Sequence, residues 1–241
     1  MRKSFTFAGK SSFEFGVYIS GSGTYGAPQR AYELLTVPGR SGSLIVDNKR
    51  LEDITVTYPA FIQDNLSANI EGLRNYLLSK IGWQRLTDDY HPNEYRMALY
   101  QGAFVPTVTR RRDAASFNLA FLCKPQRYLV SGETAVSCAS GTHTITNPTL
   151  YSAKPLIRVQ QASGAVKVSI GSTEITVAYD ESTSYPITID CDSMQVYDDD
   201  GQGVGGLVTM TSLDFPELAP GENAIAVLGG TVEITPRWYK L

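Results

Sequence analysis

The sequence predicts an all-β protein, mainly β-strands with one α-helix. The chain has 21 glycines and 12 prolines among 241 residues, spread along its whole length, as expected where many short strands are joined by turns. Between these turns, apolar and polar residues alternate in most segments, which is the period of a strand with one buried face. Only one segment shows helical spacing instead.

The first third of the chain shows signals of antiparallel hairpins. Strands are predicted in the segments 4–9, 13–19, 31–37 and 53–62. The turn after the third strand is predicted at Pro38, Gly39 and Arg40, where the chain reads PGRSG.

The segment 65–83 predicts the one helix, at about 66–81. Its apolar residues Leu66, Ile70, Leu73, Leu77 and Ile81 are spaced by 4, 3, 4 and 4 positions. This spacing places them on one face of an α-helix. We interpret the stripe as a packing face, because a helix beside a sheet buries one side.

Three arginines in succession precede the next strand, predicted at 116–123. Arg110, Arg111 and Arg112 form the most concentrated positive feature of the chain. They can be a solvated sheet edge, a salt-bridging contact with a neighbouring subunit, or a contact with an anion. We take them as candidate subunit-interface residues.

The alternation of apolar and polar residues stops at residues 124–133, where proline and glycine occur. This change predicts two domains, 1–130 and 131–241. The second domain shows closely spaced strands that predict a β-sandwich built from meanders. The segments 223–228 and 231–236 are predicted to pair as a closing hairpin through Gly229 and Gly230. Residues 234–241 are predicted to form the last strand.

Composition excludes several functions. The formal net charge of −3 provides no basic field for binding nucleic acid. We find neither a secretory signal, which needs an apolar core of about 7–15 residues, nor a membrane span of about 20. The three cysteines are an odd number at wide spacing, so we predict no disulfide framework and synthesis in a reducing cytoplasm.

No set of residues predicts catalysis, and we expect no enzyme activity, cofactor or bound metal. His91 and His143 each stand apart from other metal ligands, and no nucleophile motif is present. The acidic run Asp198–Asp200 can be a calcium loop or a turn. Its spacing does not match a calcium loop, so we favour the turn.

An ordered set of segments resembles a known family. These segments are FTFAGKSSFEFGVYIS at the start, TVPGRSGSLIVD, FLCKPQRY, ITIDCDSMQVYDDDG, DFPELAPGENAI and the final ITPRWYKL. Together they resemble the distal tail proteins of long-tailed, siphovirus-like phages that infect Gram-positive bacteria. The resemblance extends along the whole chain.

The resemblance implies a structural, non-enzymatic protein of the virion, at the distal end of the phage tail and assembled in the host bacterial cytoplasm. Residues 1–130 would form a β-sandwich that closes into a homo-hexameric ring. Residues 131–241 would form a galectin-like β-sandwich. The ring would join the tail tube protein to the tail-associated or tail-tip protein and, in some phages, to receptor-binding proteins. DNA would pass through the lumen without specific binding, and no membrane is involved.

The resemblance also gives structural roles to the C-terminal segment. Pro216 and Pro220 would stiffen the approach to a turn at Gly221, and Arg237 and Trp238 would lie in the final strand.

The alternative is a carbohydrate-binding module for host cell-wall saccharide, with Trp238 or Tyr239 as a stacking platform. Asn147 and His143 faintly resemble a galectin sugar site. Thr149 stands where the sugar-contacting arginine is expected, so we predict that sugar binding is absent.

Overall fold

The computed structural model describes residues 2–21, 23, 25–111, 113–160, 164–179 and 185–241. The chain divides into two compact units, residues 1–127 with Leu241 and residues 128–240. We call them the N-terminal and C-terminal units. Within the described ranges nearly all regular structure is β-strand, with a single α-helix, which confirms the predicted fold class.

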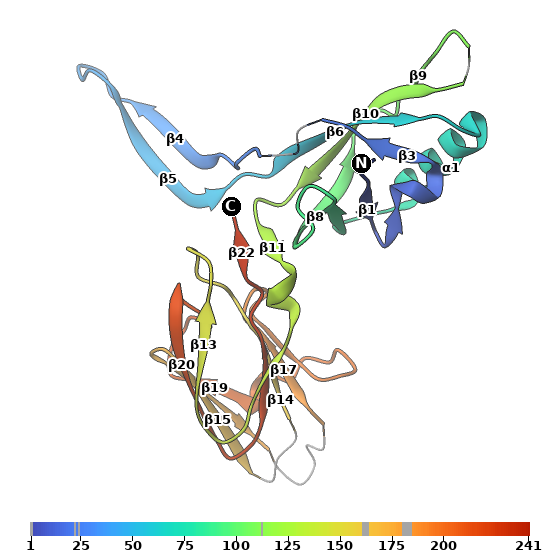
Figure 1. Cartoon of the computed structure of the whole chain (residues 1–241). Helices are drawn as coiled ribbons and strands as arrows, with labels where there is room; N and C mark the ends of the chain where they lie inside the picture. The colour runs from blue at the N-terminus through green and yellow to red at the C-terminus, as the bar shows by residue number, and fades with distance from the viewer. Residues whose placement is uncertain (1, 22, 24, 112, 161–163, 180–184) are drawn as a thin grey trace. The chain divides into compact units, whose positions relative to one another are not determined.

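One curled sheet organises the N-terminal unit (Figure 1). Its strand order is β2-β1-β7-β8-β10-β6-β3, and each neighbouring pair is antiparallel. The bounds are β1 Phe5–Phe7, β2 Lys10–Ser11, β3 Val17–Ile19, β6 Ile54–Ile62, β7 Gln84–Asp88, β8 Glu94–Gln101 and β10 Ala115–Cys123. The short β9, Thr107–Val108, pairs with the start of β10.

The sheet curls far enough for its two ends to meet. A bridge joins Lys3, just before β1, to Ile19 at the end of β3, and the N–H of Ile19 donates to the Lys3 carbonyl at 2.9 Å. The curled sheet encloses an aromatic core in which Phe5, Phe7 and Tyr58 all pack around Phe121. Cys123 is buried in the same core, as its place on the alternating strand predicts.

The helix α1, Leu66–Ser79, lies within the predicted range and ends two residues before Ile81. Leu73 and Leu77 are its fully buried residues, so the apolar stripe is a packing face. The hydroxyl of Tyr76 donates to the carbonyls of Phe7 and Ala8, both at 2.9 Å, which holds the helix against the end of β1. A 3₁₀ turn, η1 (Ser12–Phe15), packs beside the helix.

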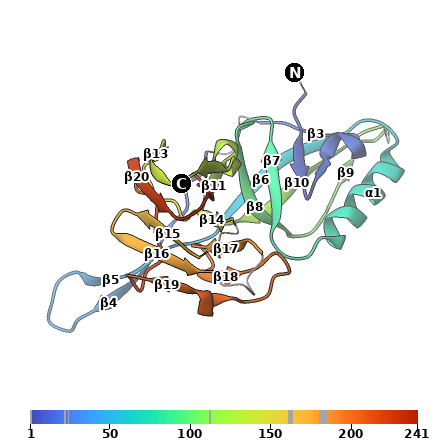
Figure 2. The same ribbon diagram turned by 90° about the horizontal axis from the view of Figure 1, so that it is seen from below.

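β4, Arg30–Thr36, and β5, Ser43–Leu51, form a separate two-stranded sheet that we call the arm. The arm extends away from the curled sheet in both views (Figures 1 and 2). Pro38 and Gly39 form the turn at its tip, where the N–H of Arg40 donates to the carbonyl of Val37 at 3.2 Å. All residues of β4 except Ala31 are exposed.

Two five-stranded sheets pack face to face in the C-terminal unit. Their orders are β12-β21-β14-β17-β18 and β13-β20-β15-β16-β19. The bounds are β12 Val136–Cys138, β13 Gly141–Asn147, β14 Leu156–Val159, β15 Ala165–Ile170, β16 Thr173–Ala178, β17 Ile187–Asp190, β18 Gln195–Tyr197, β19 Val208–Met210, β20 Gly221–Leu228 and β21 Val232–Thr235. Two 3₁₀ turns, η2 (Val130–Glu133) and η3 (Gly205–Leu207), complete it. One core contains Ile157 and Ile234 from the first sheet and Val168 and Ile225 from the second.

The predicted closing hairpin is wrong. β20 pairs with β13 and β15, whereas β21 pairs with β12 and β14, so Gly229 and Gly230 carry the chain from one sheet to the other. Gly229 has φ +86°, and a Cβ there would lie 2.4 Å from the carbonyl oxygen of Ala165. A glycine in a tight connection suits such a crossing as well as a hairpin.

The prediction of meanders is also mostly wrong. Within these two sheets, β15–β16 and β17–β18 are the neighbouring pairs that are consecutive along the chain. The predicted turn at Gly171 and Ser172 does join β15 to β16. Of the other connections, the one from β19 to β20 stays within one sheet, and the rest cross between the sheets.

The predicted last strand is interrupted. β21 ends at Thr235, and β22 is only Tyr239–Lys240. Between them Arg237 has φ +59°, which an extended strand does not allow. The N–H of Arg237 donates to the carbonyl of Gly132, and the N–H of Leu129 donates to the carbonyl of Trp238, both at 2.8 Å. The short strand β11, Arg127–Leu129, pairs with β22, so the chain enters and leaves the C-terminal unit side by side.

Candidate assembly surfaces

The arm carries apolar side chains on both of its faces. Leu34 lies directly opposite Ile45 on one face, and Leu35 lies opposite Leu44 on the other. Leu34 is 57% exposed and Ile45 is 70% exposed. A hairpin that packs against its own protein alternates apolar and polar faces, so this arm has an unusual composition.

An isolated two-stranded hairpin is marginally stable in water, and exposed strand edges favour pairing with another chain. The arm has two such edges, since β4 and β5 pair only with each other in the described part of the chain. An ion pair between Arg30 and Asp47 on neighbouring strands reinforces it near its base. These features make the arm a candidate surface for contact with another protein chain.

A second, different surface lies between α1 and β9. Its groove is lined by Leu66, Ser67, Ile70, Glu71, Arg74 and Val108. Val108 in this lining is an exposed large apolar residue. The turn that follows β9 exposes Arg110 and Arg111, while Arg112 lies outside the described residues. Apolar and cationic side chains therefore meet at this end of the N-terminal unit.

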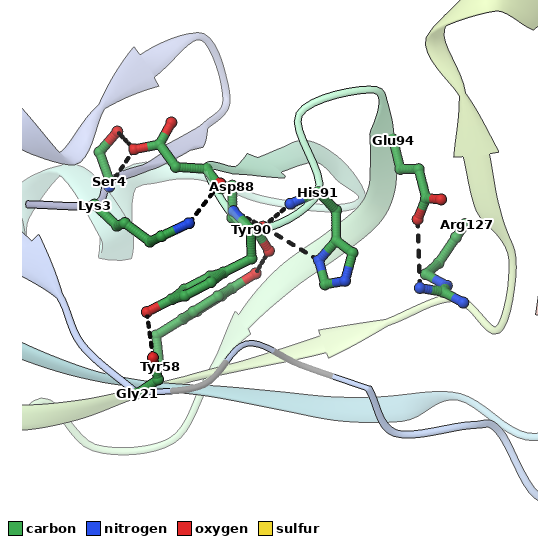
Figure 3. A network of polar contacts seen from close by, with 10 residues as sticks. Lys3, Ser4, Gly21, Tyr58, Asp88, Tyr90, His91, Glu94 and Arg127 are labelled. Carbon is green, nitrogen blue, oxygen red and sulfur yellow. Dashed lines mark hydrogen bonds and ion pairs between the residues drawn. The ribbon is translucent and has the colours of Figure 1, made fainter. Parts of the chain in front are cut away.

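A polar network fixes the turn between β7 and β8 (Figure 3). The Asp88 carboxylate accepts the hydroxyl of Tyr58 at 2.6 Å and the backbone N–H groups of Tyr90 and His91, both at 2.9 Å. Asp89 accepts the backbone N–H and the hydroxyl of Ser4 at 2.6 and 2.8 Å. The turn is therefore held to the first strand and to the core.

The same turn also holds the segment that leads to the arm. The hydroxyl of Tyr90 donates to the carbonyl of Gly21 at 3.1 Å, as Figure 3 shows. The ring of Tyr25 packs edge-on against His91, with centroids 5.4 Å apart. His91, which the sequence left without a role, is thus part of the network that fixes the base of the arm.

Arg237 and Trp238 anchor the C-terminal unit. Arg237 forms a bidentate contact with Asp190, with Nη1 to Oδ1 at 2.7 Å and Nη2 to Oδ2 at 3.3 Å. Burial raises the pKa of Asp190, but the hydrogen bonds and charge of Arg237 outweigh it and keep this pKa below the ordinary value. Trp238 is 5% exposed and belongs to the core. Its ring therefore offers no face for a sugar to stack on.

The other residues of the galectin comparison are also engaged in the fold. The side-chain amide of Asn147 is buried and donates to the carbonyls of Tyr151 and Leu218, both at 2.9 Å, while its oxygen accepts the N–H and the hydroxyl of Thr149. His143 contacts the carbonyl of Ala139 through Nε2 at 2.7 Å.

The segment before β20 contains two prolines, of which one packs inside the unit. Pro216 is buried, whereas Pro220 is exposed. Gly221 has φ +85° and begins β20, in register with Asn147. A residue other than glycine would be strained at this φ.

The acidic run has the turn geometry that the sequence favours. Asp198 accepts the N–H groups of Asp200 and Gln202 at 3.0 and 2.8 Å, and Asp199 pairs with Arg158 at 2.7 Å. Among the described residues no group of three or more His, Cys, Asp or Glu side chains could hold a metal ion. Within the same residues, no helix has the length and apolar character needed to cross a membrane.

Comparison with known proteins places these surfaces in context. No protein-family model matches the sequence, and no curated protein matches it. The crystal structure of the Dit protein of phage SPP1, described as a paradigm of the hub adsorption apparatus in phages that infect Gram-positive bacteria, superposes with a TM-score of 0.75 at 16% identity. The superposition covers 100% of both chains.

The chain has the Dit fold. Two structures of the phage p2 baseplate in its activated conformation, with calcium and with strontium, also match. Both have TM-scores of 0.53, at 8% and 9% identity, and cover 97% and 96% of this chain and 98% and 97% of theirs. The likeness to the SPP1 Dit structure extends over the whole chain, so it includes both the N-terminal and the C-terminal unit.

Proposed function

We propose that the chain is a structural component of a phage tail, a hub that joins the tail tube to the tail tip or baseplate. The observation that carries this proposal is the likeness of the entire chain to the SPP1 Dit protein, combined with an arm that is apolar on both faces. In this role the protein catalyses no reaction. Its function is to hold other proteins in a fixed geometry.

The hub would be a ring of six copies, formed by the N-terminal unit. A closed ring needs a heterologous contact, in which one surface of a subunit meets a different surface of the next. The N-terminal unit offers two such surfaces, the arm and the groove beside α1. Arg110 and Arg111 lie at the edge of the second surface, and we propose them as interface residues.

The axial partners would be the tail tube protein on one side of the ring and a tail-associated or tip protein on the other. The C-terminal unit, which we propose to be galectin-like, would lie outside the ring wall, where receptor-binding proteins can attach. Such a complex would belong to the virion and would be assembled in the host cytoplasm. The arm and the groove beside α1 are then used within the ring, which leaves the C-terminal unit for outer partners.

DNA would pass through the lumen of the ring. The net charge of −3 suits this task, because a basic lining would retain DNA by releasing its counterions. A ring that retains duplex DNA at physiological salt would contradict this part of the proposal.

The absolute mass of the purified protein tests the ring. Light scattering after size exclusion should give a mass near six times 26.3 kDa, or 157.8 kDa, and negative-stain images of that peak should show a central hole. The arm should resist proteolysis in the ring. A monomer over the whole accessible concentration range, with an arm that proteases cut readily, would contradict the proposal.

A further inference from the structure

β8 buries a charged residue where an apolar one is expected. Arg96 and Ala98 are its buried residues, while the alternate positions, Tyr95, Met97 and Leu99, are only half-buried. Arg96 is 7% exposed and lies opposite the buried Leu86 of β7. The side of the strand that faces the core therefore includes a charged residue beside the apolar Ala98, which is unusual for a buried strand face.

The guanidinium of Arg96 forms no direct ion pair in the described part of the chain, although the charge of Asp88 acts on it. None of the ion pairs there includes Arg96, and its buried Nη1 has no hydrogen-bond partner there. Burial lowers the pKa of Arg96, which reflects the cost of a desolvated cation. A buried charge without a partner strongly destabilises a protein, so a partner is expected.

The nearest carboxylates are already engaged elsewhere. The oxygens of Asp88 accept Tyr58 and two backbone N–H groups, as Figure 3 shows. Glu94 contacts Nη1 of Arg127 at 3.3 Å, and Nη2 of Arg127 donates to the carbonyl of Leu241 at 3.1 Å. None of these printed contacts includes Arg96, although Asp88 and Glu94 lie close to it.

A small cavity lies beside these groups. It has a volume of about 20 Å³ and is lined by Leu86, Thr87, Asp88, His91, Glu94, Tyr95, Arg96 and Arg127. This volume suits a single particle the size of a water molecule or a halide ion. Nitrogens of three lining residues are buried without a hydrogen-bond partner among the described residues: Nη1 of Arg96, Nε of Arg127 and Nε2 of His91. The carboxylates of Asp88 and Glu94 also line the cavity, and Oε2 of Glu94 lies 3.3 Å from Nη1 of Arg127.

All three nitrogens can donate to one particle. The two arginine N–H groups are obligatory donors. Nδ1 of His91 lies 3.4 Å from Oδ1 of Asp88, which is an ion-pair distance, and that oxygen already accepts two backbone N–H groups. Nε2 of His91 donates when the ring carries a proton on that nitrogen.

We propose that this cavity is a binding site for one small monatomic anion, with chloride as the physiological candidate, held by Arg96, Arg127 and His91. The anion supplies the direct charged contact that Arg96 does not form with a carboxylate. Bound there, it stabilises the turn between β7 and β8, which also fixes the base of the arm. The site does not depend on the ring proposal.

Chloride dependence of thermal unfolding tests the site in the full chain. At constant ionic strength, replacing gluconate by chloride should raise Tm by about 3–6 °C for each tenfold increase in chloride above its Kd. Arg96→Met should abolish this dependence, whereas Lys167→Met, which changes an exposed cation on β15 of the C-terminal unit, should leave it intact. An equal Tm in both salts, or a chloride dependence that survives in Arg96→Met, would overturn the proposal.

Bromide provides a second measurement that does not depend on the folding of a variant. Crystals of the wild-type protein grown in bromide should show an anomalous scattering peak within hydrogen-bonding reach of Nη1 of Arg96 and Nε of Arg127. A cavity that contains only water, with bromide elsewhere on the surface, would identify an adventitious ion only and would refute the site.

Discussion

Charging one face of the arm should prevent ring assembly without unfolding the protein. The double substitution Leu34→Glu and Ile45→Glu places two carboxylates directly opposite each other on one face. Leu34 is 57% and Ile45 is 70% exposed in the single chain, so their replacement removes little internal packing. The isolated subunit should therefore keep its Tm to within about 2 °C, because surface changes alter stability by only about 0.5 kcal/mol.

The loss of binding free energy at the subunit interface follows from the exposed fractions of the same two side chains. Full burial of a leucine or isoleucine side chain contributes about 2 kcal/mol. Covering the exposed parts of Leu34 and Ile45 therefore contributes about 2.5 kcal/mol at each subunit contact. This corresponds to a reduction of about 70-fold in the association constant per contact, before the cost of desolvating two carboxylates is added.

Mass photometry over a concentration series measures this effect. The wild-type protein should populate the ring, and the variant should remain monomeric at least about 70-fold higher in concentration. Leu213→Glu with Leu228→Glu is the matched control, since both leucines are exposed but lie outside the arm. A variant that forms rings at the wild-type concentration would refute the role of the arm.

Three further results are expected. Gly229→Ala should lower the free energy of unfolding by about 2 kcal/mol or more in urea titrations, because of its φ of +86° and the nearby Ala165 carbonyl; Gly203→Ala, with open space around it, should not. The pKa of Asp190 lies below its ordinary value of 3.8, so the stability from its pair with Arg237 is present above about pH 4 and lost as pH falls below that value. Acid titrations of Asp190→Asn should lack this component. Burial raises the pKa of two of the three buried thiols to about 12, so at pH 8 a thiol reagent should label the native protein slowly and the unfolded chain at all three positions.

Local sequence patterns predicted where the helix and the strands lie better than they predicted which strands pair with each other. The spacing of Leu73 and Leu77 is a property of one segment, so the helix could be located from the sequence. Gly229 and Gly230 gave equally local information, namely that the chain turns. The strands on either side of these glycines can pair with each other or lie in opposite sheets. Distant segments such as β13 and β14 decide between the two, and the glycines themselves carry no information about those segments.

The cavity beside β8 and the arm show a second limit of prediction from sequence, because both depend on which residues are buried. The alternation in β8 predicts a strand, but only the packing shows that its arginine lies inside. The inward position of Arg96 would follow from the even-numbered register it shares with Ala98, but the sequence does not give that register. In the same way, Leu34 and Ile45 look like core residues in the sequence. A single sequence does not reveal that they lie exposed on the arm.

The adjacent entry and exit of the C-terminal unit give it the properties of an interchangeable module. The hydrogen bond from Leu129 to Trp238 closes the unit on itself, so its first and last residues are neighbours. A domain with adjacent ends can be circularly permuted, or replaced by an unrelated domain, with little change in the chain that carries it. Exchange of this unit would therefore leave the strands and the arm of the N-terminal unit unchanged.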